Sequence, residues 1–148
     1  MNSEIPPVKL SLRERRNKPV FKAVLVYEDV AAAVRARRFC ERLVRVLGST
    51  LEEQIWNFDV LGIREVGNLA ASAARKADIV IVSLSGRTEL PHTIRGWLNM
   101  WLWLLEVENP ALVMLFDSSA KQNSEPTRAY LGSIAQRGKI AFFQNEVS

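Results

Sequence analysis

Acidic and hydroxyl side chains follow three apolar stretches of the sequence, and their types could support chemistry. The adjacent acids Glu28 and Asp29 offer carboxylate oxygens, the ligands that Mg²⁺ prefers, and Asp117 could join them. The stretch 83–89 combines hydroxyls, a glycine, an arginine and an acid, and these groups should converge with the acidic pair. The candidate ligand-binding residues are Glu28, Asp29, Ser83, Ser85, Gly86, Arg87, Thr88, Asp117 and Ser118.

The elements that must position these residues follow from the hydrophobic pattern. Continuous apolar runs at 21–27, 78–84 and 111–116 are typical of strands buried inside a parallel sheet. The mixed polarity of 53–60 predicts an edge strand, and 140–143 predicts a fifth strand. Helical spacing predicts helices over 30–47, 64–77 and 92–107, and a fourth helix that begins near Ser124 and Pro126 and ends at Gly138.

Strands and helices alternate along the whole chain, which is typical of an α/β fold with right-handed crossovers. We predict a three-layer, doubly wound, five-stranded parallel sheet in the order 2-1-3-4-5. Residues 21–148 form one domain in this interpretation, and residues 1–20 form an irregular basic arm with three prolines.

The loops at the carboxyl ends of strands one, three and four should meet at the switch point of this sheet, where such folds bind ligands. Only residues 145–148 follow the last strand, so the usual final helix is missing. One face over strands three to five would then be half covered, at a cost of roughly 1.5–3 kcal/mol for each wet apolar side chain. We expect the N-terminal arm or a second subunit to cover it.

The segment SLSGRTELP (83–91) resembles the corresponding loop of flavodoxins, where a turn with Ser, Thr and Gly precedes Glu-Leu-Pro and a helix. The α/β order is similar too, and the resemblance implies FMN as a ligand. Flavodoxins hold the FMN phosphate in a Ser/Thr- and Gly-rich loop after strand one. Here that loop is YEDVAAAV (27–34), whose two carboxylates would repel a phosphate.

The acidic pair after strand one also resembles that of bacterial receiver domains, which hold Mg²⁺ there. Receivers carry a phosphoaccepting aspartate at the end of strand three, where this chain has Ser83 or Ser85. They carry a hydroxyl after strand four, which Ser118 matches, and a lysine after strand five, where this chain has Gln144. The resemblance therefore implies a degenerate receiver that forms no acyl phosphate.

The helix predicted over 92–107 is apolar around most of its circumference, whereas a helix packed on one side of a sheet needs only a narrow apolar stripe. Three tryptophans in seven residues match the composition of interface anchors, although a helix buried between two neighbours is the alternative. We expect a homodimer through this helix or through the uncovered sheet face. The candidate interface residues are Trp97, Trp101, Trp103 and Leu104.

Composition bounds the remaining possibilities. The chain has 148 residues and a single cysteine, Cys40, which excludes an internal disulfide and a cysteine-based metal site. Residues 1–22 hold six basic and two acidic side chains, and the remainder holds 14 of each, so the basic character belongs to the arm. The sequence shows no signal core and no membrane span, so we expect a cytoplasmic protein without a nucleic-acid partner.

These features favour a non-catalytic regulatory or protein-interaction module that acts as a dimer, with no cofactor and no metal. A further protein partner stays open. The alternative is a flavodoxin-like domain that binds a flavin such as FMN, or a nucleotide, at the 83–90 loop. A Ser-His-Asp hydrolase built on Ser83 or Ser85, His92 and Asp117 is disfavoured, because no nucleophile-elbow motif surrounds either serine.

Overall fold

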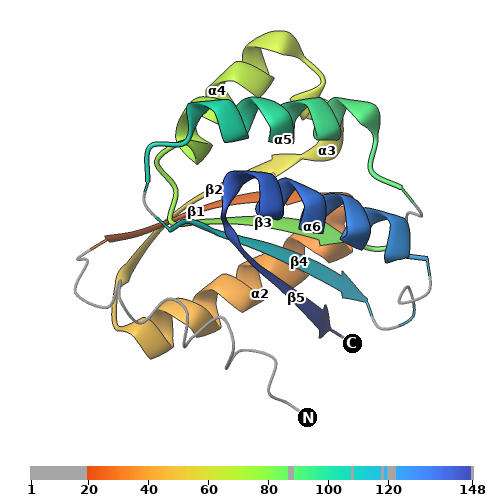
Figure 1. The fold of residues 1–148 in the computed structure, drawn as a ribbon. Coiled ribbons are helices and arrows are strands. Elements are labelled where there is room, and N and C mark those ends of the chain that lie inside the picture. Colours follow the sequence, from red (N-terminus) through yellow and green to blue (C-terminus); the bar gives the residue numbers. More distant parts are fainter. Residues whose placement is uncertain (1–19, 87–88, 108, 118, 120–122, 148) are drawn as a thin grey trace.

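Five parallel strands form one twisted sheet in the order β2-β1-β3-β4-β5, as the sequence predicts (Figure 1). The structure is a computed structural model and describes residues 20–86, 89–107, 109–117, 119 and 123–147. The strands are β1 (Val20–Tyr27), β2 (Thr50–Asn57), β3 (Ile79–Leu84), β4 (Ala111–Asp117) and β5 (Ala141–Val147). β3 is buried at all six positions, which fits its unbroken run of apolar residues.

The helices cover the two faces of the sheet unequally. α2 (Val30–Leu47) lies on one face, and the remaining helices lie on the other (Figure 1). Those helices are α3 (Phe58–Leu61), α4 (Arg64–Ala74), α5 (His92–Leu104) and α6 (Glu125–Gly138). Gly48, with φ of 72°, ends α2 in the left-handed conformation, which a glycine adopts without the strain of a Cβ.

Several element boundaries differ from prediction. β5 runs to Val147 instead of 143, α4 and α5 end at Ala74 and Leu104 instead of 77 and 107, and the second strand is displaced. The prediction placed it over 53–60, whereas β2 begins at Thr50 and Phe58 already starts the short helix α3. An edge strand offers no continuous apolar run, so parallel pairing with β1, Val20 to Thr50 and onward, sets its position instead. α4 has a glycine at position 67 because the Cβ of any other residue would come within 2.9 Å of the Leu61 carbonyl oxygen.

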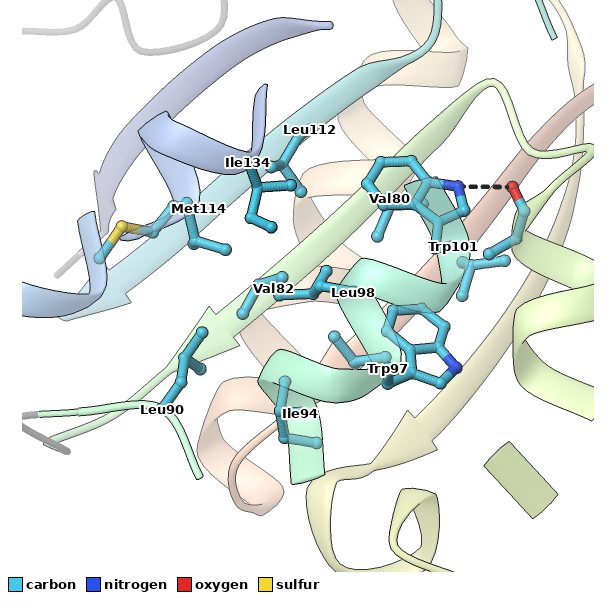
Figure 2. Packing of buried hydrophobic residues seen from close by; sticks show 14 of the residues in the cluster. Val80, Val82, Leu90, Ile94, Trp97, Leu98, Trp101, Leu112, Met114 and Ile134 are labelled. Atoms are coloured by element: carbon cyan, nitrogen blue, oxygen red, sulfur yellow. Dashed lines mark hydrogen bonds between the residues drawn. The ribbon is translucent and has the colours of Figure 1, made fainter. Parts of the chain in front are cut away.

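α5 is buried between α4 and α6, which explains why it is apolar on several sides. Leu98 and Trp101 are fully buried, and Ile94 packs in the same cluster (Figure 2). The Trp101 indole Nε1–H donates to the Ala74 carbonyl at 3.0 Å, at the end of α4. On the other side the Asn99 side-chain amide donates to the Tyr130 hydroxyl of α6 at 2.9 Å.

The face of the sheet on the α2 side is buried over β4 as well as over β1 and β3. Ala111, Val113 and Leu115 are each 0% exposed, and Phe143 of β5 is partly buried against them. A second subunit is therefore not needed to remove these side chains from water. The arm that we expected to cover this face, residues 1–20, lies outside the described residues except for Val20, which belongs to β1.

The amino ends of three strands are joined by Asp78, a buried acid just before β3. Its carboxylate accepts a hydrogen bond from the Lys22 amide at 2.9 Å, and its carbonyl accepts one from the Ala111 amide at 3.1 Å. These bonds fix the register on which the opposite, carboxyl edge depends. In the part of the chain that is described, the helices are too short or too polar to pass through a bilayer.

Candidate functional site

The loop after β1 ends in a helix cap. Asp29 has extended backbone angles, and its Oδ1 accepts a hydrogen bond from the Ala32 amide at 2.9 Å. This bond satisfies one of the amide groups that the first turn of a helix leaves open. Asp29 therefore occupies, with its own carboxylate, the position at a helix N-terminus where a phosphate would bind.

The loop after β3 is bonded to this cap through Ser85. The Ser85 amide donates to Glu28 Oε1 at 2.8 Å, and the Ser85 hydroxyl donates to Asp29 Oδ1 at 2.7 Å. The Glu28 amide in turn donates to the Ser83 carbonyl at 3.1 Å. The two acids that the sequence offers as ligands are thus brought together by Ser85, which donates to both of them.

Arg35 completes this cluster, and the sequence analysis did not place it there. One guanidinium nitrogen, Nη2, donates to the Leu84 carbonyl at 2.7 Å and to the Ser85 hydroxyl at 2.8 Å. Arg35 follows the fully buried Ala32 by three residues, so it borders the buried face of α2. Arg42 follows the buried Phe39 by the same interval and is exposed, so helical spacing alone does not separate Arg35 from it.

Opposing influences act on the pKa of Asp29. Burial raises it, but the hydrogen bonds from Ser85 and Ala32 and the positive charge of Arg35 together lower it below its ordinary value. The charged carboxylate is therefore the form that this cluster stabilises. An acidic pair without such donors would show the reverse, because each carboxylate would disfavour ionisation of the other.

Ser83 is not available as a nucleophile or a ligand. It is fully buried, and its hydroxyl donates to the Ala32 carbonyl at 2.7 Å. The hydroxyl of Ser85 donates to Asp29, so the one proton of each candidate serine is engaged. Neither serine donates to His92, which is exposed at the start of α5, and this arrangement lacks the serine–histidine bond of a catalytic triad.

The third loop contributes less to the site. Asp117, at the end of β4, accepts a hydrogen bond from the Ser119 amide of its own loop at 3.4 Å. Among the described residues, acids, histidines and cysteines nowhere gather in threes that could hold a metal ion, so Asp117 does not join Glu28 and Asp29 in one cluster. Gly86 is exposed, and three predicted site residues lie outside the described residues: Arg87, Thr88 and Ser118.

Comparison with solved structures finds the same doubly wound arrangement in an oxidoreductase from Corynebacterium diphtheriae. The TM-score is 0.62 over 84% of this chain and 79% of that chain, at 9% sequence identity. The likeness is one of fold alone. No protein-family model matches the sequence, and no curated protein matches it.

The four predicted interface residues separate into two buried and two exposed side chains. Trp97 and Trp101 are 2% and 0% exposed, so these two are core residues of a single chain and are removed from the candidate interface. The reason is that α5 packs against α4 on one side and α6 on the other. Trp103 is 89% exposed and Leu104 is 39% exposed, and both remain candidates.

Trp97 and Trp101 differ in one respect. Their indole rings lie one turn apart on α5, with both nitrogens on the same side (Figure 2). The nitrogen of Trp101 has the Ala74 carbonyl as its acceptor, whereas the buried nitrogen of Trp97 has no hydrogen-bond partner among the described residues. The Ala74 carbonyl, at the end of α4, also accepts a hydrogen bond from the Ala77 amide at 3.0 Å.

Proposed function

We propose that the chain is a non-catalytic regulatory or protein-interaction module that acts as a homodimer. One observation carries the proposal: the Asp29 carboxylate caps α2 and accepts the hydroxyl of Ser85. In a ligand-binding sheet of this topology, the same edge presents open amides and hydroxyls to a ligand. Here the described groups at that edge serve to hold two loops together.

The departures from receiver domains support the same proposal. Ser83 or Ser85 stands in the place of the phosphoaccepting aspartate. The Ser83 hydroxyl is buried and donates to the Ala32 carbonyl, and the Ser85 hydroxyl donates to Asp29. A module of this kind has lost the phosphorylation switch and keeps the scaffold. Its regulatory role would then depend on which protein surface it contacts.

The surface of α5 supports a protein partner. Soluble proteins rarely leave a large aromatic side chain almost fully in water, and Trp is enriched among residues that dominate binding energy. Trp103 is such a residue, and Leu104 extends its apolar surface. Both lie far along α5 from the carboxyl edge, so binding there is independent of the Asp29 cluster.

The second candidate function is a flavin- or nucleotide-binding domain with its site at loop 83–90. The description of the structural neighbour as an oxidoreductase favours it, as does the general rule that doubly wound sheets bind ligands at this edge. The place of Asp29 at the N-terminus of α2 weighs against it, because a phosphate there would meet a carboxylate.

Two measurements on the purified chain test the proposal. We expect a colourless protein whose melting temperature does not change with FMN, and a molar mass in solution of twice 16.7 kDa. FMN at 100 times its dissociation constant would stabilise the fold by about 2.7 kcal/mol, equivalent to a rise of roughly 5–10 °C. A yellow protein, or a rise of that size, overturns the proposal in favour of the second candidate.

A further inference from the structure

Trp103 is the most exposed large apolar side chain of the described residues. It is 89% exposed in the last turn of α5, and Leu104 beside it is 39% exposed. An indole is the largest apolar side chain, and tryptophan is enriched at protein–protein interfaces.

A groove lies on the same helix, between the first half of α5 and the start of α4. Its volume is about 250 Å³, and its lining includes Gly62, Gly67 and Gly96, with Arg64 and Asn68 beside them. A Cβ at Gly96 would meet nothing within 4 Å, so this wall of the groove is open. A cavity of roughly 150 Å³ holds a benzene molecule. The groove is therefore large enough for an indole.

Trp103 and the groove are spaced along α5 so that each can contact the other in a pair of chains. Trp103 follows Gly96 by seven residues, which is two helical turns, about 10 Å along the axis and within roughly 20° of the same direction. Met100, which also lines the groove, lies near the midpoint. Two α5 helices packed antiparallel around a two-fold axis between Asn99 and Met100 therefore place each Trp103 over Gly96 of the second copy.

Charge favours this arrangement as well. Arg64 lines the groove, and its guanidinium can lie on the face of an inserted indole. This cation–π contact would occur twice in a two-fold dimer.

We propose that the partner of the α5 surface is a second copy of this chain, with Trp103 of each copy inserted into the glycine-lined groove of the other. The inference rests on the proposed function as a homodimeric module and names its interface. Each contact occurs twice in such a dimer, because a two-fold axis repeats every pair of residues.

Substitutions on the two sides of the contact test it, with molar mass measured by light scattering on the full chain. Trp103→Ala removes the inserted side chain. Gly96→Leu fills the groove, and the single chain has space for the new side chain because a Cβ at this position meets nothing within 4 Å. Each should raise the dimer dissociation constant at least about a hundredfold, since a central tryptophan is a hot spot and each change is present twice. Val30→Ala, at a residue 78% exposed on α2, is the control and should leave the mass unchanged.

A cross-link tests the position of the two-fold axis. Met100→Cys should form a disulfide-linked dimer under mild oxidation, because the two copies of this residue lie beside the axis. The natural Cys40 is fully buried and should not contribute. Val30→Cys is the matched control and should stay monomeric on a denaturing gel.

The outcomes separate this inference from the proposed function. A wild-type dimer that persists in both Trp103→Ala and Gly96→Leu overturns the inference and leaves the proposed dimeric module standing, with its interface elsewhere. A wild-type monomer overturns both. Circular dichroism on each variant confirms that the fold is intact, so that loss of the dimer together with a native spectrum supports the inference.

Discussion

Replacing Asp29 by alanine distinguishes a structural carboxylate from one kept for a ligand. Acidic residues held ready for a metal or another ligand repel each other, and removing one of them stabilises the free protein. Asp29 is instead bonded to the Ala32 amide and the Ser85 hydroxyl. We therefore expect Asp29→Ala to lower the free energy of unfolding.

The size of the loss follows from the bonds that disappear. Removing an N-cap carboxylate costs about 1 kcal/mol, and leaving the Ser85 hydroxyl without its acceptor costs about 1 kcal/mol more at an exposed site. The expected sum of about 2 kcal/mol corresponds to a fall in melting temperature of roughly 4–8 °C for a chain of this length.

Urea unfolding followed by the fluorescence of the buried tryptophans, Trp97 and Trp101, measures this loss. The pKa of Asp29 is lowered in the folded state, so its contribution is complete above the pKa of the unfolded chain, about 3.9. It disappears as the pH falls through the lower folded pKa. The difference between wild type and Asp29→Ala should thus be largest near neutral pH and shrink below about pH 4.

Asp29→Asn is the matched control, because it keeps an oxygen that accepts from the Ala32 amide and removes only the charge. We expect it to lose about 0.5 kcal/mol, from the helix dipole and the attraction to Arg35. An Asp29→Ala variant as stable as the wild type, or more stable, would refute the interpretation of the carboxyl edge as an internally bonded cluster.

Two further matched pairs test the packing of the α4–α5 layer. Trp101→Phe should cost about 1 kcal/mol more than Trp97→Phe in urea unfolding, because only the Trp101 nitrogen has an acceptor; equal losses would contradict this hydrogen bond. Gly67→Ala should destabilise by about 1–3 kcal/mol, because its Cβ would lie 2.9 Å from the Leu61 carbonyl oxygen. Gly132→Ala in α6 is the control, because its Cβ would meet nothing closer than 3.8 Å, and it should stabilise the fold by about 0.5–1 kcal/mol. A change in the free energy of unfolding that has the same sign for both variants would contradict the close contact at Gly67.

The sheet was predictable because its central strands are apolar without interruption. β3 and β4 are buried along their lengths, so composition alone marks them as strands and the alternation with helices fixes their direction. β2 alternates between exposed and half-buried residues, and its position depends on pairing with β1. A long-range register of this kind leaves no local signal.

The sequence predicted which loops form the candidate site, but it did not predict the hydrogen bonds between them. Which loops meet follows from the topology, so Glu28, Asp29 and Ser85 were named together. That Ser85 bonds to both acids depends on the register of β1 against β3, Tyr27 beside Ser83. The four predicted interface residues could likewise not be told apart from the sequence. Only the packing of α4 and α6 around α5 shows that Trp97 and Trp101 are buried and that Trp103 and Leu104 are exposed.

Sedimentation equilibrium of the wild-type chain, run beside Gly96→Leu at tens of micromolar, shows whether this domain acts through a protein contact on α5. The predicted result is a mass of twice 16.7 kDa for the wild type and 16.7 kDa for Gly96→Leu. A wild-type mass of 16.7 kDa at every concentration would contradict it.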